Sequence, residues 1–346
     1  METKKSENTG NGWIVRVSSS IGLGGGHVNR CLTLAKPLSS HASVIFVLDK
    51  DGRNWINYIK KTGFEAVCET GCNLPKVRAC IIDLRDGAKT FATKWRHQLD
   101  FIASFGDVSE APQDCDVEIG AQFSTTPSSP RTPYLAGPDY ALVDPKYYHI
   151  GLGKIREKVE QLMISFGLHD TANATSKALL AIKKLEERKL FRPKSILVYL
   201  GSQAPHKEDV RYHLQLFGGR AKLVLDSGNI LAGLKDCDLA IGGGGVGMFE
   251  RASAGVPSLT FTIADNQIPN ASGAHSAKIT MYAGDIRCLS LTQLESAILQ
   301  MVKNTHLRRV IALSGPQLID GKGAFRLAGA LHRLARGSNM SRPGMT

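Results

Sequence analysis

The sequence predicts an α/β protein built from two Rossmann-like domains that face each other across a cleft. Short apolar runs alternate with helical patterns, and fully apolar strands separated by helices indicate a parallel sheet covered on both faces. This alternation starts afresh after a stretch rich in Ser, Thr and Pro at residues 124–138, and each half carries a glycine-rich turn between a strand and a helix. At 346 residues, the chain also exceeds the size of about 250–300 residues at which single cores stop growing.

We therefore expect an N-terminal domain at residues 11–150, a C-terminal domain at 151–336, and disordered tails at 1–10 and 337–346. In the first half, strands are predicted at 13–17, 44–48, 79–83 and 101–105, with helices over 28–38 and 55–61. Pro37 should kink or end the first of these helices. In the second half, strands are predicted at 162–166, 195–200, 223–225, 239–241 and 257–261, with a helix over 173–188.

Composition narrows the class of protein. No run of about 18 apolar residues occurs, and the first residues lack the apolar core of a signal peptide, so we expect a soluble, cytoplasmic protein without a membrane span. The net charge of +12 is spread along the chain without a nucleic-acid recognition motif, which favours a general affinity for anionic ligands. Seven scattered cysteines fit reduced thiols, and Cys68 and Cys72 lack the second pair that a zinc site needs.

The first glycine-rich turn, residues 22–26, delivers His27 to the start of a helix. Glycines let the backbone approach a ligand closely, and the first helical N–H groups attract anions. The same positive helix end disfavours an imidazolium, so we expect His27 to be neutral and able to accept a proton. A histidine that merely faces water remains the alternative. Asp83 and Asp107 follow two predicted strands, where each is either functional or a cap or turn residue.

The second glycine-rich turn runs from Gly242 to Gly247, directly after a strand and before a helix. Its amide donors, with no side chains in the way, form a nest that fits a pyrophosphate. Glu250 has a carboxylate suited to a ribose diol, with a solvated surface residue as the alternative. Asn266 and Gln267 supply amides that can orient a sugar hydroxyl or a water, unless they form a plain surface turn.

Several motifs together resemble a known family, the nucleotide-sugar hydrolases of pseudaminic acid biosynthesis and the related spore-coat polysaccharide proteins. These belong to the glycosyltransferase-B (GT-B) superfamily, which also contains the lipid II-forming N-acetylglucosaminyltransferase. The resemblance runs from about residue 13 to about residue 335. The segments that carry it, in order, are 24–35, 134–142, 163–170, 242–250, 255–257, 265–267 and 320–324.

The resemblance implies inverting hydrolysis of a UDP-linked diacetamido-trideoxyhexose, without a required metal or cofactor, by a protein expected to be monomeric. His27 would then activate the attacking water, Asn266 would help to position it, and Glu250 would hold the ribose. Contacts to substrate or nucleotide are expected from Gly25, Gly26, Arg30, Tyr140, Gly167, Gly243, Gly244, Gly245, Val246 and Gln267.

The sequence also departs from the family pattern. Ser18 stands where an acidic residue is usual, Leu168-His169 replaces Gly-Thr, Asp144 replaces an arginine, and the second glycine turn lacks its usual hydroxyls. A glycosyltransferase and a non-catalytic nucleotide-sugar-binding protein therefore stay open as alternatives. A nicotinamide dehydrogenase, with Asp49 on the ribose, is less well supported because His27 displaces the third glycine of the fingerprint.

Overall fold

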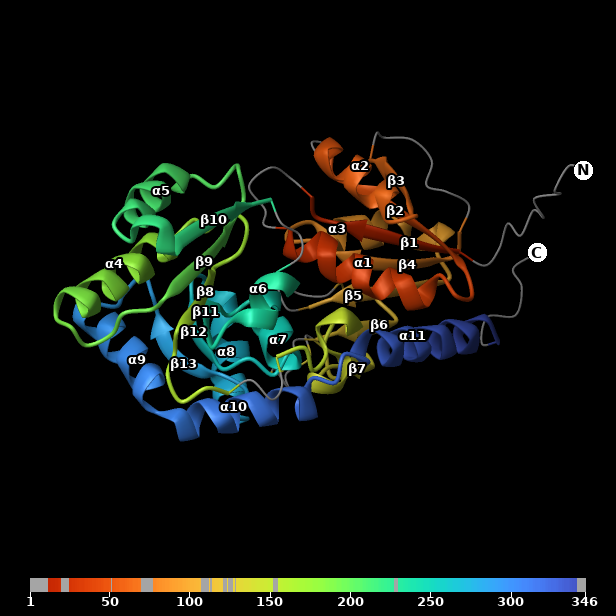
Figure 1. Cartoon of the computed structure of the whole chain (residues 1–346). Coiled ribbons are helices and arrows are strands. Elements are labelled where there is room, and N and C mark those ends of the chain that lie inside the picture. The colour runs from red at the N-terminus through yellow and green to blue at the C-terminus, as the bar shows by residue number, and fades with distance from the viewer. Residues whose placement is uncertain are drawn as a thin grey trace, which may run out of the picture.

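The computed structural model describes residues 12–19, 25–50, 52–69, 77–106, 112, 114–120, 123, 127, 129–151, 155–226 and 230–340. Within them the chain forms two parallel sheets, each flanked by helices and each with its own apolar core (Figure 1). The predicted class, two Rossmann-like α/β halves, is confirmed. Among the helices of these residues, none has the length and apolar character that crossing a membrane requires.

The first sheet has the strand order β3-β2-β1-β4-β5-β6-β7, with every neighbouring pair parallel. Its strands are β1 (Gly12–Val17), β2 (Ser43–Leu48), β3 (Glu65–Cys68), β4 (Ala79–Asp83), β5 (Phe101–Phe105), β6 (Val117–Ile119) and β7 (Tyr134–Leu135). Its helices are α1 (Gly26–Leu38), α2 (Arg53–Lys61) and α3 (Ala88–Trp95). All four predicted strands are present and almost fully buried, and α1 ends one residue after Pro37, as predicted.

The second sheet has the order β10-β9-β8-β11-β12-β13, again parallel throughout. Its strands are β8 (Gln161–Ser165), β9 (Ser195–Leu200), β10 (Ala221–Leu225), β11 (Leu239–Gly243), β12 (Ser258–Thr262) and β13 (Met281–Asp285). The helices around it are α4 (Ala174–Glu187), α5 (Lys207–Gln215), α6 (Leu231–Asp236), α7 (Val246–Ser253), α8 (Ile268–Ser276), α9 (Leu291–Lys303) and α10 (Thr305–Leu318). Numbered within the sheet, the order is 3-2-1-4-5-6, the order of the Rossmann fold.

In both sheets the order reverses beside the first strand, between β1 and β4 and between β8 and β11. Ligands of open α/β sheets bind beyond the carboxyl ends of the strands at such a reversal. The first glycine-rich turn follows β1 and the second follows β11. The topology therefore brings each turn to the binding edge of its own sheet.

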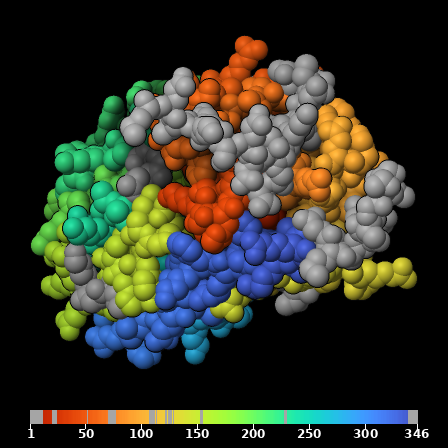
Figure 2. All heavy atoms as spheres, turned by 90° about the vertical axis from the view of Figure 1, so that its right-hand side faces the viewer, coloured from red at the N-terminus to blue at the C-terminus, as the bar shows by residue number. Residues whose placement is uncertain are grey.

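The last helix, α11 (Gly323–Met340), corrects the predicted domain boundaries. Its apolar side chains Ala324, Leu327 and Leu331 belong to the core of the first sheet, and the helix lies against α1. Figures 1 and 2 show this blue helix beside the red N-terminal segment. The chain thus returns to the N-terminal half before residue 336, and the helix continues through Met340, where a tail was predicted from 337.

The outward crossing also begins earlier than the predicted boundary at residue 150. Ala141, Val143 and Tyr147 already pack in the core of the second half. Gly323, at the start of α11, lies so close to this segment that a Cβ on it would come within 2.2 Å of the carbonyl oxygen of Ala141. The two crossings therefore lie against each other at this point.

Candidate active site

A cavity of about 420 Å³ opens between the two halves. It is lined by Gly25 and Gly26 of the first glycine-rich turn, by the second glycine-rich turn, by the end of β8, and by the segment after β12. Every predicted site residue except Tyr140 lines it: Gly25, Gly26, His27, Arg30, Gly167, Gly243, Gly244, Gly245, Val246, Glu250, Asn266 and Gln267. Tyr140 instead packs against the core of the first half.

His27 is held by a buried carboxylate that the sequence only hinted at. Its Nδ1 lies 2.7 Å from Oδ1 of Asp83, which is the last residue of β4 and has no solvent exposure. An ionised carboxylate only accepts hydrogen bonds, so Nδ1 must donate, and Nε2 of a neutral ring carries the lone pair. The ring lines the cavity and keeps 16% of its side-chain surface exposed. The neutral state of His27 stays a prediction.

Arg30 keeps Asp83 ionised. Its Nε and Nη2 each donate to the carboxylate at 2.6 Å, and its guanidinium lies 4.2 Å from the ring centre of Phe105. Burial by itself would raise the pKa of Asp83, but the charge of Arg30 and the hydrogen bonds from Arg30 and His27 outweigh it and hold that pKa well below its usual range. Arg30 lines the cavity, and its observed contacts orient the Asp83–His27 pair. Its contact with substrate or nucleotide stays a prediction.

The backbone entering the first glycine turn is fixed by Asp49. The N–H of Ser19 donates to Oδ2 of Asp49 at 2.7 Å, and Ser19 Oγ accepts from the N–H of Asp49 at 2.9 Å. Arg16 pairs with Asp49 at 2.8 Å and with Glu69 at 2.9 Å. Because its carboxylate is engaged here, Asp49 is a poor ribose ligand, which further weakens the dehydrogenase alternative. Residues 20–24 of the turn and Asp107 lie outside the described residues.

The second glycine turn is tied to the segment after β12 by Gln267. Its Oε1 accepts from the N–H of Gly244 at 3.3 Å and from the N–H of Ile263 at 3.1 Å. Gly244 therefore does not offer its amide to a ligand in this state. Within the described part of the chain, the N–H groups of Gly245, Val246 and Gly247 make no hydrogen bond, because the first amides of a helix have no partner within it, and all three residues line the cavity.

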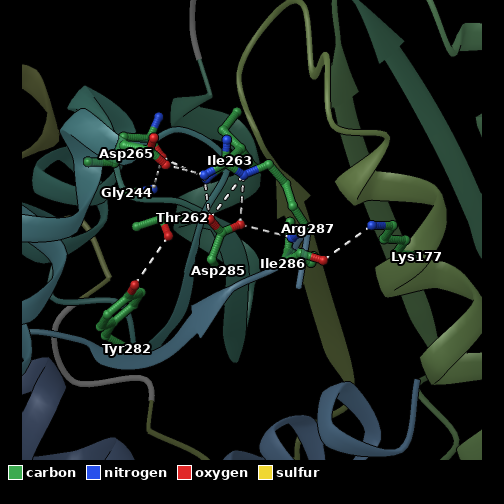
Figure 3. A network of polar contacts seen from close by, with 10 residues as sticks. Lys177, Gly244, Thr262, Ile263, Asp265, Tyr282, Asp285, Ile286 and Arg287 are labelled. Carbon is green, nitrogen blue, oxygen red and sulfur yellow. Dashed lines mark hydrogen bonds and ion pairs between the residues drawn. The ribbon is translucent and has the colours of Figure 1, made fainter. Parts of the chain in front are cut away.

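An ion-pair network supports the turn that carries Asn266 and Gln267. Arg287 pairs with Asp285, at the end of β13, and with Asp265, the residue before Asn266 (Figure 3). Lys177 of α4 donates to the carbonyl oxygen of the neighbouring Ile286 at 3.2 Å. Asn266 is exposed and lines the cavity, as a residue that positions a water or sugar hydroxyl would.

Glu250 is a half-buried carboxylate on α7 that lines the same cavity. Burial raises its pKa to about 7, even though the adjacent charge of Arg251 acts in the opposite direction. A group with this pKa changes its charge near neutral pH. Glu250 is therefore suited to hydrogen-bonding hydroxyl groups of a ligand, with an ionised form that accepts two of them.

Four residues at which the sequence departs from the pattern that it resembles fall into two groups. Leu168 and His169 line the cavity, where they alter its surface directly. Asp144 lies outside the cavity lining, paired with Lys36 at 2.7 Å, and Ser18 Oγ accepts from the N–H of Arg85 at 2.9 Å. Asp144 and Ser18 thus make contacts within the fold rather than with the cavity.

Comparison with known proteins supports the fold. No family model matches the chain. The chain is 25% identical over 205 residues to the spore coat polysaccharide biosynthesis protein SpsG of Bacillus subtilis. This alignment covers 57% of this chain and 58% of SpsG. The chain spans little more than half the length of the curated relatives it matches.

Two solved structures share the arrangement of both halves. MurG of Acinetobacter baumannii is 14% identical with a TM-score of 0.63, covering 93% of this chain and 99% of that one. WaaG, a glycosyltransferase involved in lipopolysaccharide biosynthesis, is 12% identical with a TM-score of 0.53. The match covers 96% of this chain and 100% of the WaaG chain. The protein has the GT-B fold.

Proposed function

We propose that the protein hydrolyses a UDP-linked diacetamido-trideoxyhexose, with inversion at the anomeric carbon and release of UDP and free sugar. The observation that carries the proposal is the Asp83-bound His27, whose ring lines one cavity together with the free amides of Gly245, Val246 and Gly247. A base and an anion site in one cavity, contributed by opposite halves, suit displacement of a diphosphate by water.

In this mechanism, Nε2 of His27 takes a proton from the water as it attacks the anomeric carbon. Positioned base catalysis contributes about 10²–10⁴-fold to such a rate. Asp83 holds the imidazole in the required tautomer and stabilises the charge it acquires. Asn266 helps to orient the water, and the amides at the start of α7 stabilise the negative charge on the departing UDP. Glu250 accepts hydrogen bonds from the ribose hydroxyls.

Glycosyl transfer is the second candidate function. The likeness to the glycosyltransferase WaaG favours it, and a histidine that activates water can equally deprotonate an acceptor hydroxyl. In that reaction the same base and the same anion site act on a different nucleophile.

The test is UDP release from UDP-linked diacetamido sugars by the purified protein, with and without candidate acceptor sugars. We expect release without an acceptor. His27→Ala should lower the rate by at least about 10²-fold while UDP affinity changes little. His97→Ala, at an exposed histidine of the same half that does not line the cavity, is the matched control. Release only with an acceptor would establish a transferase, and UDP binding without any release would indicate a binding protein.

A further inference from the structure

Arg251 lies beneath the second glycine turn, with only 1% of its surface exposed, yet it lines the cavity. Its guanidinium occupies space that a side chain on Gly242 would fill. A Cβ there would lie 2.7 Å from Nη1 of Arg251 and 2.3 Å from the carbonyl oxygen of Ser165. The missing side chain of Gly242 thus makes room for the guanidinium of Arg251, whereas Gly245 and Gly247 line the cavity.

The guanidinium is anchored on one side. Nη2 donates to the carbonyl oxygen of Gly243 at 2.9 Å and to Oγ1 of Thr260 at 3.2 Å. Thr260 in turn lies 2.7 Å from Oγ1 of Thr280, whose hydroxyl donates to the carbonyl oxygen of Ser258 at 3.0 Å. This chain of buried hydroxyls fixes the arginine in place.

The other side of the guanidinium has donors with no acceptor. Nε is buried without a hydrogen-bond partner, and neither Nη1 nor any other nitrogen of Arg251 pairs with a carboxylate in the part of the chain that the structure describes. Buried donors are nearly always satisfied, and an unpaired buried charge is costly. Burial lowers the pKa of Arg251 to about 10, which still leaves the group charged at neutral pH.

The positively charged side chains of the cavity lining differ in how their charge is balanced. Among the described residues, the lysines and arginines that line it are Arg30 and Arg251 alone. Arg30 is paired with the carboxylate of Asp83, so its charge is balanced within the protein. Arg251 forms no such ion pair, although the charge of Glu250 acts on it. Its Nη1 lies 3.6 Å from the position of a Cβ on Gly247, and Oε2 of Glu250 lies 3.8 Å from the same position. The guanidinium of Arg251 therefore lies close to Gly247, in the first turn of α7.

We propose that Arg251 is the fixed cation that binds the diphosphate of the ligand and makes the site select nucleoside diphosphates over nucleosides. The inference builds on the proposed function in taking a UDP-linked sugar as the ligand. Arginine suits this task because its N–H groups match phosphate oxygens. A charge held in place before the reaction also stabilises the diphosphate as it departs.

The experiment compares dissociation constants for UDP, UMP and uridine, measured by calorimetry on wild type, Arg251→Gln and Thr260→Val. We expect Arg251→Gln to weaken UDP binding by about tenfold to a hundredfold and uridine binding by less than about twofold. Thr260→Val removes an anchor but keeps the charge, so its ratio of UDP to uridine affinity should stay near that of wild type. Equal weakening of UDP and uridine by Arg251→Gln would assign the arginine a structural role only, and unchanged UDP binding would also overturn the proposal.

A second measurement does not depend on how the neutral variant folds. In wild-type protein with ¹⁵N-labelled arginine, the Nε–H resonance of Arg251, assigned by its loss in Arg251→Lys, should shift with UDP and with inorganic pyrophosphate but not with uridine. An Nε–H chemical shift that changes with neither UDP nor pyrophosphate would refute the proposal. Turnover separates the two proposals. If Arg251→Gln selectively loses UDP affinity but the wild-type protein hydrolyses no UDP-sugar, the role of Arg251 stands and the hydrolase is rejected. If the wild-type protein hydrolyses UDP-sugar but Arg251→Gln binds UDP as well as wild type, the hydrolase stands and the role of Arg251 is rejected.

Discussion

Replacing Asp83 with asparagine tests the role assigned to the buried carboxylate. Four contacts surround it, from Nδ1 of His27 at 2.7 Å, Nε and Nη2 of Arg30 at 2.6 Å each, and Sγ of Cys31 at 3.3 Å. All are donors in the arrangement described above. An amide offers one acceptor oxygen and two N–H donors, so one of its ends must face a donor.

Either orientation of the new amide is harmful. If its nitrogen faces His27, the ring must present a lone pair at Nδ1 and a proton at Nε2, so the base is lost. If its nitrogen faces Arg30, buried N–H groups oppose each other. We therefore expect kcat to fall by about 10²–10⁴-fold with little change in KM. Stability should fall by about 3–5 kcal/mol, because the substitution breaks the ion pair between Arg30 and the fully buried carboxylate.

The assays are steady-state UDP release and urea unfolding, with Asp116→Asn as the control. Asp116 also binds an arginine through two hydrogen bonds, from Arg96 at 2.6 and 2.9 Å, but does not line the cavity. The control should lose stability and keep kcat. A folded Asp83→Asn protein with kcat within about threefold of wild type would refute the reasoning, as would an equal loss of kcat in the control.

The effect of Asp83→Asn on stability should also depend on pH in the acidic range. The pKa of Asp83 is lower in the folded protein than its unfolded value of about 3.9, so its stabilising effect is complete above that value and disappears as pH falls toward the folded pKa. The difference in unfolding free energy between wild type and Asp83→Asn should therefore be constant near neutral pH and shrink below about pH 4. A difference that stays constant in acid would contradict the assignment of the low pKa.

Three further predictions concern the nucleotide side of the cavity. Uridine affinity should increase as pH rises through about 7, where Glu250 ionises, and Glu250→Gln should remove this dependence in calorimetry; an unchanged profile would exclude Glu250. Gly245→Ala, whose Cβ would meet only the Nε2 of Gln267 at 3.7 Å, should keep the melting temperature and weaken UDP binding, whereas Gly242→Ala should lower the melting temperature; the reverse pattern would count against the assignment. Gln267→Met should cost about 1–3 kcal/mol in urea unfolding, because two backbone N–H groups lose their acceptor, and no loss would show that these bonds are dispensable.

Strands buried on both faces could be predicted from the sequence, and of the peripheral strands only the edge strand β10, with its apolar run at residues 223–225, was predicted. The missed strands β3, β7 and β13 are the other edge strands of their sheets, and β6, of three residues, lies next to an edge. Edge strands are less buried, so they need no continuous apolar run, and β13 even contains a glycine and an aspartate. The signal that identifies a central strand is absent from them.

The functional site, too, could be predicted only in part from the sequence. The glycine turns and His27 are local patterns between a strand and a helix, so the sequence reveals them. The partner Asp83 is 56 residues from His27 and becomes its neighbour only because β1 pairs with β4, a fact that periodicity does not contain. The role of Gly242 was likewise hidden, since a glycine that makes room for Arg251 looks the same as one that receives a ligand.

The return of α11 to the first sheet bears on how this protein can be recombined with others. A chimera joined once near residue 150 would take α11 from the other parent, and Leu327 and Leu331 would meet a sheet that they did not evolve to cover. The unit that can be exchanged intact is therefore discontinuous, with two junctions, one at each crossing. Recombination that respects only the order of residues along the chain will cut through a hydrophobic core.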